Sequence, residues 1–117
     1  MTLEGRLDAD VSSDGSKSAM VTFEFTVTNA GSETVTLQFT DGCKADFVVR
    51  EDGREVWRFS EGRMFTQALS SETLEPDETA TYKAEWTAPQ PGGYIGRAEL
   101  QARETACEVQ TDFAITE

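Results

Sequence analysis

The sequence predicts an all-β protein: an antiparallel, immunoglobulin-like β-sandwich of about eight strands. Three observations lead to this prediction. Hydrophobic and polar side chains alternate with a period of two through most of the 117 residues, turn residues separate the alternating segments, and no long stretch has the 3.6-residue period of an amphipathic helix. This length suits one hydrophobic core, so a single domain over residues 1–117 is expected.

The first three strands are expected within residues 2–40. Residues 2–11 alternate and predict a strand with one solvent-facing side, while residues 12–18 contain no hydrophobic side chain and predict a loop or a wide hairpin turn. The most regular strand is expected over residues 19–28, because every second residue from Val21 to Val27 is Val or Phe. Residues 35–39 alternate again after a turn, so they form either a hairpin with the preceding strand or a corner between two sheets.

A tight hairpin is predicted in the middle of the chain. Residues 45–51 and 54–60 are strand-like and flank Asp52-Gly53, a pair that tolerates the positive φ angles of a two-residue turn. The larger side chains of each run alternate and should face inward: Phe47, Val49, Trp57 and Phe59.

The second half of the chain is expected to contain three more strands. Residues 60–63 lack a strand pattern and lead into Met64-Phe65, an apolar pair that should be pinned to the protein at one end. Residues 66–74 have no sustained period and predict an irregular crossover. Strands are expected over residues 80–86, 94–104 and 107–115, after a turn at residues 75–78 and a loop at residues 87–93.

The charge of the chain restricts its partners. Asp and Glu total 22 against 10 Lys and Arg, giving a net charge of −12, which disfavours nucleic acid and anionic membranes as partners. Such an excess suits a salt-adapted, halophilic cytoplasm, although an ordinary acidic domain carries it for solubility alone. No apolar run approaches the ~20 residues of a membrane span, and the N-terminus lacks the features of a secretory signal, so a cytoplasmic protein is expected.

The residues that usually carry catalysis are scarce. The chain has no His, and it contains no phosphate-binding or dinucleotide-binding glycine motif and no CxxC pair. We therefore expect a protein that is not an enzyme and that uses no cofactor. Cys43 and Cys107 match no metal spacing and are expected to be free thiols rather than a disulfide. Asp8, Asp10 and Asp14 do not match a calcium loop, so we expect a solvated acidic surface and no metal.

Several motifs resemble those of the BsuPI-type intracellular proteinase inhibitor family. The resemblance covers about residues 21–100, and its central part is Asp46-Phe47-x-Val49, Asp52-Gly53-x-x-Val56-Trp57-x-x-Ser60 and Met64-Phe65-x-Gln67-x-Leu69. Asn29-x-Gly31 fits the family's opening strands, and Pro91-Gly92-x-Tyr94 fits a later turn. This chain departs from the family at two positions, because it has Asp77 where Gly is usual and Cys43 where a small residue other than Cys is commoner.

The resemblance implies inhibition of an intracellular serine protease of the subtilisin type, by binding rather than by chemistry. A sandwich can bind a protease through a rigid loop that enters the active-site cleft, or through an edge strand that pairs with the substrate-binding strands of the enzyme. The alternative is an immunoglobulin-like protein-interaction module with no protease target. In either case we expect a monomer or a weak dimer.

Two loops are candidates for the contact with a partner protein. In the first, residues 60–66, Met64 or Phe65 would fill a pocket for large apolar side chains; the alternative is that these two residues belong to the core together with Trp57 and Phe59. In the second, residues 88–94, prolines stiffen the chain and glycines allow close approach of the backbone; the alternative is a plain connection between strands. The candidate contact residues are Ser60, Glu61, Gly62, Arg63, Met64, Phe65, Pro89, Pro91 and Gly92.

Overall fold

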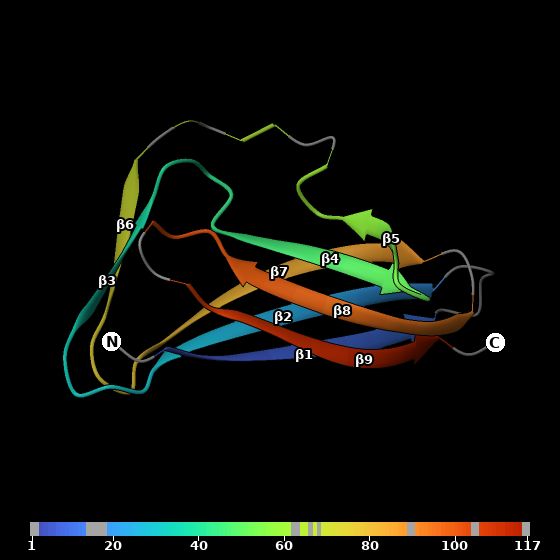
Figure 1. Cartoon of the computed structure of the whole chain (residues 1–117), viewed down its shortest axis with the longest axis horizontal. Helices are drawn as coiled ribbons and strands as arrows, with labels where there is room; N and C mark the ends of the chain where they lie inside the picture. Colours follow the sequence, from blue (N-terminus) through green and yellow to red (C-terminus); the bar gives the residue numbers. More distant parts are fainter. Residues whose placement is uncertain are drawn as a thin grey trace.

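The protein is described by a computed structural model that covers residues 3–13, 19–61, 64–65, 67, 69–88, 91–103 and 106–115. These residues form nine strands and no helix (Figure 1). The strands are β1 (Leu3–Ser13), β2 (Ala19–Asn29), β3 (Val35–Phe39), β4 (Ala45–Glu51), β5 (Arg54–Arg58), β6 (Ser70–Leu74), β7 (Thr79–Ala88), β8 (Gly92–Leu100) and β9 (Glu108–Ile115). All of the strand pairs are antiparallel. The predicted antiparallel all-β sandwich is confirmed, and its immunoglobulin-like type stays a prediction.

Two larger sheets and one ribbon make up the fold. A three-stranded sheet has the order β1-β2-β7, and a four-stranded sheet has the order β5-β4-β8-β9. β3 and β6 form a two-stranded ribbon at one end of the molecule (Figure 1). Because β3 pairs with β6 and not with β2, residues 29–34 form a corner between sheets rather than a hairpin.

Aromatic side chains fill the space between the two larger sheets. Phe23 of β2 is 1% exposed, and the centroid of its ring lies 6.1 Å from that of Phe47 on β4 and 5.6 Å from that of Phe113 on β9. Trp57 of β5 stacks on Trp86 of β7 at 6.0 Å and so joins the sheets at another edge. Burial of each large apolar side chain stabilises the fold by about 1.5–3 kcal/mol. The inward faces predicted for β2 and for the central hairpin are therefore confirmed.

The central hairpin has the turn that its sequence predicts. Asp52 and Gly53 have φ angles of 52° and 79°, so both turn residues adopt positive φ. The pairing of β4 with β5 contains a bulge, because Val49 pairs with Trp57 whereas Arg50 pairs with Glu55. β5 ends at Arg58, two residues before the end of the predicted run.

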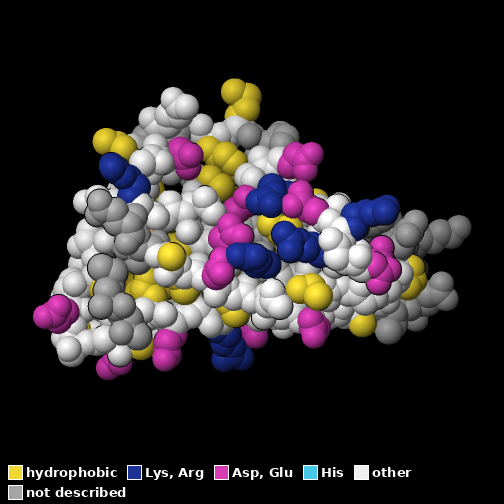
Figure 2. All heavy atoms as spheres, viewed as in Figure 1, with side chains coloured by type: hydrophobic (Ala, Val, Ile, Leu, Met, Phe, Trp, Pro, Cys, Tyr) yellow, Lys and Arg dark blue, Asp and Glu magenta, His cyan; other side chains and the backbone are white. Residues whose placement is uncertain are grey.

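β4 is buried on both faces. The outward-facing Val48 is only 2% exposed, because it pairs with Arg58 of β5 on one side and Arg97 of β8 on the other. Long arginine side chains can cover an apolar neighbour while their charged ends stay in water. Arg97 pairs with Glu99 at 3.1 Å and also with Glu108, so basic and acidic side chains alternate over this sheet (Figure 2).

Two further predictions, a crossover without a strand and the limits of a later strand, are wrong. Residues 70–74, predicted to lie in an irregular crossover, form β6, which pairs with β3 from Ser70↔Phe39 to Leu74↔Val35. Only Leu74 of β6 is buried, so the strand has no repeating apolar side that would predict it. β8 begins at Gly92 and ends at Leu100, and the loop predicted at residues 87–93 is correspondingly shorter.

Asn29 holds the corner where β2 ends. Its side chain is completely buried, and its Nδ2 donates to the carbonyl oxygens of Glu33 at 2.7 Å and Leu74 at 2.9 Å. Its Oδ1 accepts a hydrogen bond from the amide of Gly31 at 3.0 Å. One side chain therefore ties β2 to the turn that follows it and to the end of β6, which orients the β3-β6 ribbon.

β1 and β9 lie side by side and close one edge of the sandwich (Figure 1). A Cβ atom at Gly5 of β1 would lie 3.0 Å from Sγ of Cys107 and 3.2 Å from the ring of Phe25, so glycine permits this close approach. Cys43 and Cys107 are both free and half-buried, which confirms the expectation of two thiols.

Candidate protein-binding surface

The first candidate loop lies in the segment between β5 and β6, residues 59–69, which we call the β5–β6 segment. It crosses the upper side of the molecule from the four-stranded sheet to the ribbon (Figure 1). The structure describes residues 59–61, 64, 65, 67 and 69 of this segment, so the candidate residues Gly62 and Arg63 lie outside the described residues.

Ser60 is held to β4 by a buried carboxylate. Asp46 is 6% exposed, and its carboxylate accepts hydrogen bonds from the amide of Ser60 at 3.1 Å and from the hydroxyl of Ser60 at 2.7 Å. The same carboxylate accepts from the amide of Phe47 at 2.9 Å and from Arg58 at 3.2 Å. Hydrogen bonds to an ionised group are stronger than neutral ones. The start of the β5–β6 segment is therefore fixed to the beginning of β4, an inner strand of the four-stranded sheet.

Phe65 gives the segment a second attachment. Its ring is half-buried, and its centroid lies 6.1 Å from that of Phe59. Phe59 in turn lies edge-on to Phe47 at 5.8 Å and to Trp57 at 6.4 Å. Phe65 therefore rests on the rim of the aromatic core, and the expectation that Met64-Phe65 is pinned at one end fits this arrangement.

Met64 has the opposite placement. Its side chain is 99% exposed, although it is next to Phe65 in the chain. Leu69, at the end of the segment, is 82% exposed. Hydrophobic side chains stand out along the upper rim of the molecule, where this segment runs (Figure 2). The alternative that Trp57, Phe59, Met64 and Phe65 all belong to the core is thus wrong for Met64. Trp57 and Phe59 pack against the core, and Phe65 rests on Phe59 at its rim.

A polar cavity of about 250 Å³ lies beneath the segment. Its lining comes from the β3–β4 connection, from the Asp46–Ser60 pair and from Phe65: Thr40, Asp41, Cys43, Asp46, Ser60, Phe65 and Gln101. Burial, with the nearby carboxylates of Asp46 and Asp41, raises the pKa of the Cys43 thiol to about 11. This thiol is therefore protonated at neutral pH and is a poor nucleophile.

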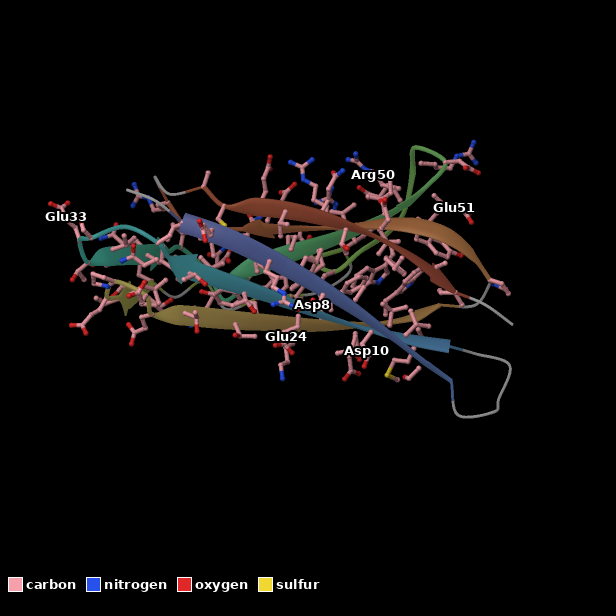
Figure 3. All side chains as sticks on the ribbon, turned by 90° about the horizontal axis from the view of Figure 1, so that it is seen from below. Asp8, Asp10, Glu24, Glu33, Arg50 and Glu51 are labelled. Atoms are coloured by element: carbon pink, nitrogen blue, oxygen red, sulfur yellow. The ribbon has the colours of Figure 1, made fainter. Side chains whose placement is uncertain are left out.

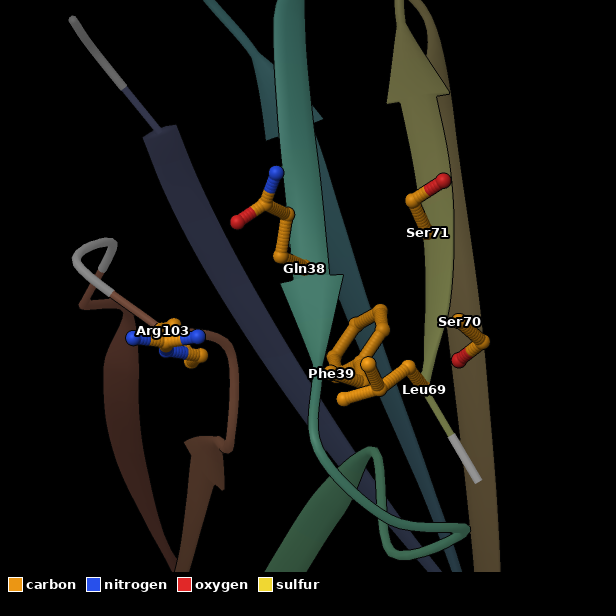
Figure 4. A pocket seen from close by; sticks show the side chains of 6 residues that line it. All are labelled: Gln38, Phe39, Leu69, Ser70, Ser71 and Arg103. Carbon is orange, nitrogen blue, oxygen red and sulfur yellow. The ribbon is translucent and has the colours of Figure 1, made fainter.

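A groove of about 310 Å³ continues from the end of the segment onto the ribbon (Figure 4). Leu69 lies beside Phe39 at its apolar side, and Arg103 stands across β3 next to Gln38. The amide of Arg103 donates to the carbonyl of Gln38 at 2.7 Å, which holds the groove's far wall to β3. Lys44 lies 5.6 Å from the centroid of the Phe39 ring and pairs with Glu72 at 2.9 Å. The groove thus adds a mixed apolar and basic surface beside Leu69.

The second candidate loop is mostly strand. Pro91 is exposed, but Gly92 is half-buried and pairs with Ile115 of β9 as the first residue of β8. A Cβ atom at Gly92 would lie 2.8 Å from Oε2 of Glu51. The group that the Gly92 backbone approaches closely is therefore the Glu51 side chain of the same protein, and not a partner. Pro89 lies outside the described residues. This loop is at the end of the sandwich far from the ribbon, so the fold separates it from the exposed part of the β5–β6 segment (Figure 1).

β5 is one edge of the four-stranded sheet, but it is poorly suited to strand addition. The bulge at Val56 interrupts its ladder, and Arg54 and Glu55 are exposed and charged. Natural proteins use bulges and charged residues at edges to prevent pairing with another chain. Of the two binding modes considered above, the loop therefore suits this surface better than the edge strand.

Leu69, 82% exposed, is not among the candidate contact residues named from the sequence. It belongs to the family-like motif Met64-Phe65-x-Gln67-x-Leu69, yet nothing local distinguishes an exposed leucine from a core leucine. Glu61 is exposed, and its amide donates to the carbonyl of Arg58 at 3.2 Å.

Among the described residues no group of three or more Cys, Asp or Glu side chains is arranged to hold a metal ion. Nor does any described segment form a helix long and apolar enough to cross a membrane.

Comparisons with known proteins give one family and a set of structures. A sequence model of the BsuPI family, described as an intracellular proteinase inhibitor, matches residues 3–105. No curated protein matches the sequence. A Bordetella pertussis protein assigned as ApaA is 16% identical with a TM-score of 0.54, over 97% of this chain and 92% of that chain. At this identity the likeness shows a shared fold only.

Beta-glucosidase 3B from Thermotoga neapolitana, solved in complex with alpha-D-glucose, is 15% identical with a TM-score of 0.49. The match covers 99% of this chain but 16% of the glucosidase, so the chain spans a small part of that protein's length.

Proposed function

Because the chain belongs to the BsuPI family of intracellular proteinase inhibitors, we propose that it inhibits a serine protease of the subtilisin type in the cytoplasm, by binding and not by catalysis. The contact is made by the β5–β6 segment, with Met64 as the side chain that enters the enzyme. The observation that carries this proposal is the 99% exposure of Met64 in a segment that is attached to the sandwich at Ser60 and at Phe65.

The attachments matter because binding costs conformational entropy. Ordering a flexible side chain or loop costs about 0.5–1.5 kcal/mol for each immobilised side chain, and a segment already ordered in the free inhibitor avoids part of that cost. Asp46 holds Ser60 on one side of Met64, and Phe59 holds Phe65 on the other. Beyond Phe65, the segment enters β6 at Ser70, which pairs with β3.

The chemistry of the exposed side chain indicates the kind of pocket. Met64 is long, unbranched and apolar, so it fits a pocket that accepts large apolar side chains. Phe65 is the weaker candidate of the two, because moving its ring into an enzyme would break its contact with Phe59. The target is accordingly a protease that cleaves after large apolar residues.

The contact area requires more than one side chain. Protease–inhibitor complexes bury about 1,600 Å² in total, or about 800 Å² on each partner. Leu69, 82% exposed, and the groove beside it continue the surface from Met64 onto the ribbon. We propose that Leu69 is a second anchor, and that the loop at Pro91 makes no contact because it lies at the other end of the sandwich (Figure 1).

Titration of a subtilisin-type protease with the purified protein tests the proposal. The assay is run in strong salt, because a chain of net charge −12 repels itself in dilute buffer. We expect stoichiometric loss of activity, and we expect Met64→Ala to weaken inhibition about tenfold or more without changing the melting temperature. Met20→Ala is the matched control, because Met20 is 41% exposed on β2, away from the segment.

Three outcomes count against the proposal. Indifference of the protease, or slow digestion of the protein, favours an interaction module with no protease target. Equal losses from Met64→Ala and Met20→Ala would remove the special role of the segment. Lower thermal stability of Met64→Ala without a binding defect would show that Met64 supports the fold instead.

A further inference from the structure

We propose that Met64 is an oxidation site and that hydrogen peroxide, by converting it to methionine sulfoxide, releases the protease from inhibition. This inference rests on the proposed function. In the reaction the thioether sulfur of Met64 attacks one oxygen of the peroxide, so that the sulfur–oxygen bond forms as the oxygen–oxygen bond breaks. The proton of the transferred oxygen passes to the departing oxygen, which leaves as water. The sulfur is oxidised, and the peroxide is the oxidant that is reduced.

Exposure directs the reaction to Met64. An oxidant in solution meets a side chain that is 99% exposed, whereas Met20, on the surface of β2, is 41% exposed. The chain carries few methionines, three in all, and Met1 lies outside the described residues. Of the two described methionines, Met64 should therefore react first.

The two cysteines compete poorly for peroxide. Thiols react with peroxide as thiolates, so a raised pKa slows them. Burial, with the carboxylates of Asp46 and Asp41, raises the pKa of Cys43 to about 11, and burial with the nearby Glu108 also raises the pKa of Cys107. Both side chains are half-buried. Among the described sulfur atoms, the fold thus half-buries the two thiols and partly covers Met20, whereas Met64 at the proposed contact is almost fully exposed.

Oxidation changes the chemistry of the contact and leaves the fold intact. A sulfoxide carries a polar oxygen that accepts hydrogen bonds, and an apolar protease pocket offers it no donor, so binding should weaken roughly 10- to 100-fold. The side chain is 99% exposed, so the melting temperature should not change. Methionine sulfoxide reductases reduce such a product, so the effect is reversible.

The test compares inhibition before and after treatment with hydrogen peroxide. Mass spectrometry of peptides locates the added oxygen on Met64, Met20 or a cysteine, and the inhibition constant is measured on the same sample. Met64→Leu keeps a large apolar side chain of similar volume and cannot form a sulfoxide. Met20→Leu is the matched control. We expect peroxide to weaken inhibition by the wild type and by Met20→Leu, and to leave Met64→Leu unchanged.

Different failures identify different errors. If Met64 is fully oxidised and inhibition is unchanged, the oxidation switch is wrong while protease inhibition stands. The switch is also wrong if Met64→Leu loses inhibition after peroxide, or if Met20 or a cysteine is oxidised before Met64. If the untreated wild type and both variants fail to inhibit, the proposed function is wrong, and the switch falls with it.

Discussion

Asp46 and Ser60, 14 positions apart in the chain, are joined by two hydrogen bonds, one from the Ser60 amide at 3.1 Å and one from its hydroxyl at 2.7 Å. Asp46 lies on β4, and Ser60 follows the end of β5. This pair converts the end of the central hairpin into a fixed starting point for the β5–β6 segment.

Asp46→Asn should destabilise the protein and loosen the segment. The amide keeps the shape of the side chain but loses its charge and presents a donor toward donors, so we expect a loss of about 1.5–3 kcal/mol in the free energy of unfolding. Ser60→Ala removes only the hydroxyl bond and should cost about 1 kcal/mol. Urea unfolding measures both losses. Equal losses would mean that the carboxylate is no more important than one neutral hydrogen bond.

Asp77→Gly should stabilise the protein. Asp77 has a φ angle of 70°, and its amide donates to the carbonyl of Asn29 at 2.8 Å, so the turn before β7 requires a left-handed backbone at this position. Glycine adopts this conformation without strain. We expect a gain of up to about 1 kcal/mol by thermal or urea unfolding.

The control for Asp77→Gly is Asp77→Asn, which removes the charge but keeps a side chain. A gain of the same size from Asp77→Asn would assign the effect to charge and not to the backbone, since the protein carries a net charge of −12.

Salt should stabilise the protein. Asp8 of β1 lies directly opposite Glu24 of β2, and Asp10 follows on the same outer face (Figure 3). Arg6 pairs with Asp8 at 3.3 Å and Lys83 pairs with Glu24 at 3.9 Å, so the remaining repulsion comes from the excess of acidic side chains in a chain of net charge −12. Salt shortens the screening length from about 10 Å at 0.1 M to about 3 Å at 1 M, which weakens this repulsion. The melting temperature should therefore rise with NaCl, and Asp10→Asn should make the rise shallower. Gln110→Ala, at an exposed neutral position of β9, should leave the slope unchanged; a melting temperature independent of salt would contradict this account.

Alkaline pH should destabilise the protein. Burial, with the nearby Glu72, raises the pKa of Tyr82 above its ordinary value of about 10, and the Tyr82 hydroxyl donates to Glu72 at 3.3 Å. The pKa of Cys43 is raised from 9.0 to about 11. A group whose folded pKa is raised favours the folded state fully below its unfolded pKa, and this contribution is lost as pH rises through the folded pKa. Stability should thus begin to fall at about pH 9.

Cys43→Ala and Tyr82→Phe separate the two contributions. Urea unfolding at pH 8 and at about pH 10.5 should show a smaller loss for Cys43→Ala than for the wild type, because a thiolate no longer has to form in a half-buried site. Tyr82→Phe should flatten the dependence at the highest pH values. If both variants keep the wild-type slope, other groups cause the alkaline loss.

Most of the fold could be predicted because its signals are local. Alternation along β2 predicts which side of the strand is buried, and Asp52-Gly53 predicts a turn with positive φ, since both depend on neighbouring residues alone. The family could also be predicted, because the central residues that resemble it lie close together in the chain between β4 and Leu69, and the family model matches residues 3–105. β6 could not be predicted, because it is a strand only through its pairing with β3.

The sequence by itself determined an antiparallel β protein with a dry interior, a strongly acidic surface and two candidate loops. Only the tertiary structure decided that Met64 points into solvent while Phe65 rests on Phe59, and that Leu69 lies beside a groove. It also decided that the turn before β8 is remote from Met64 and Leu69 (Figure 1). The physical reason is that an apolar side chain is buried only where other elements provide a surface for it. For two neighbours in a loop, that surface comes from residues distant in the chain.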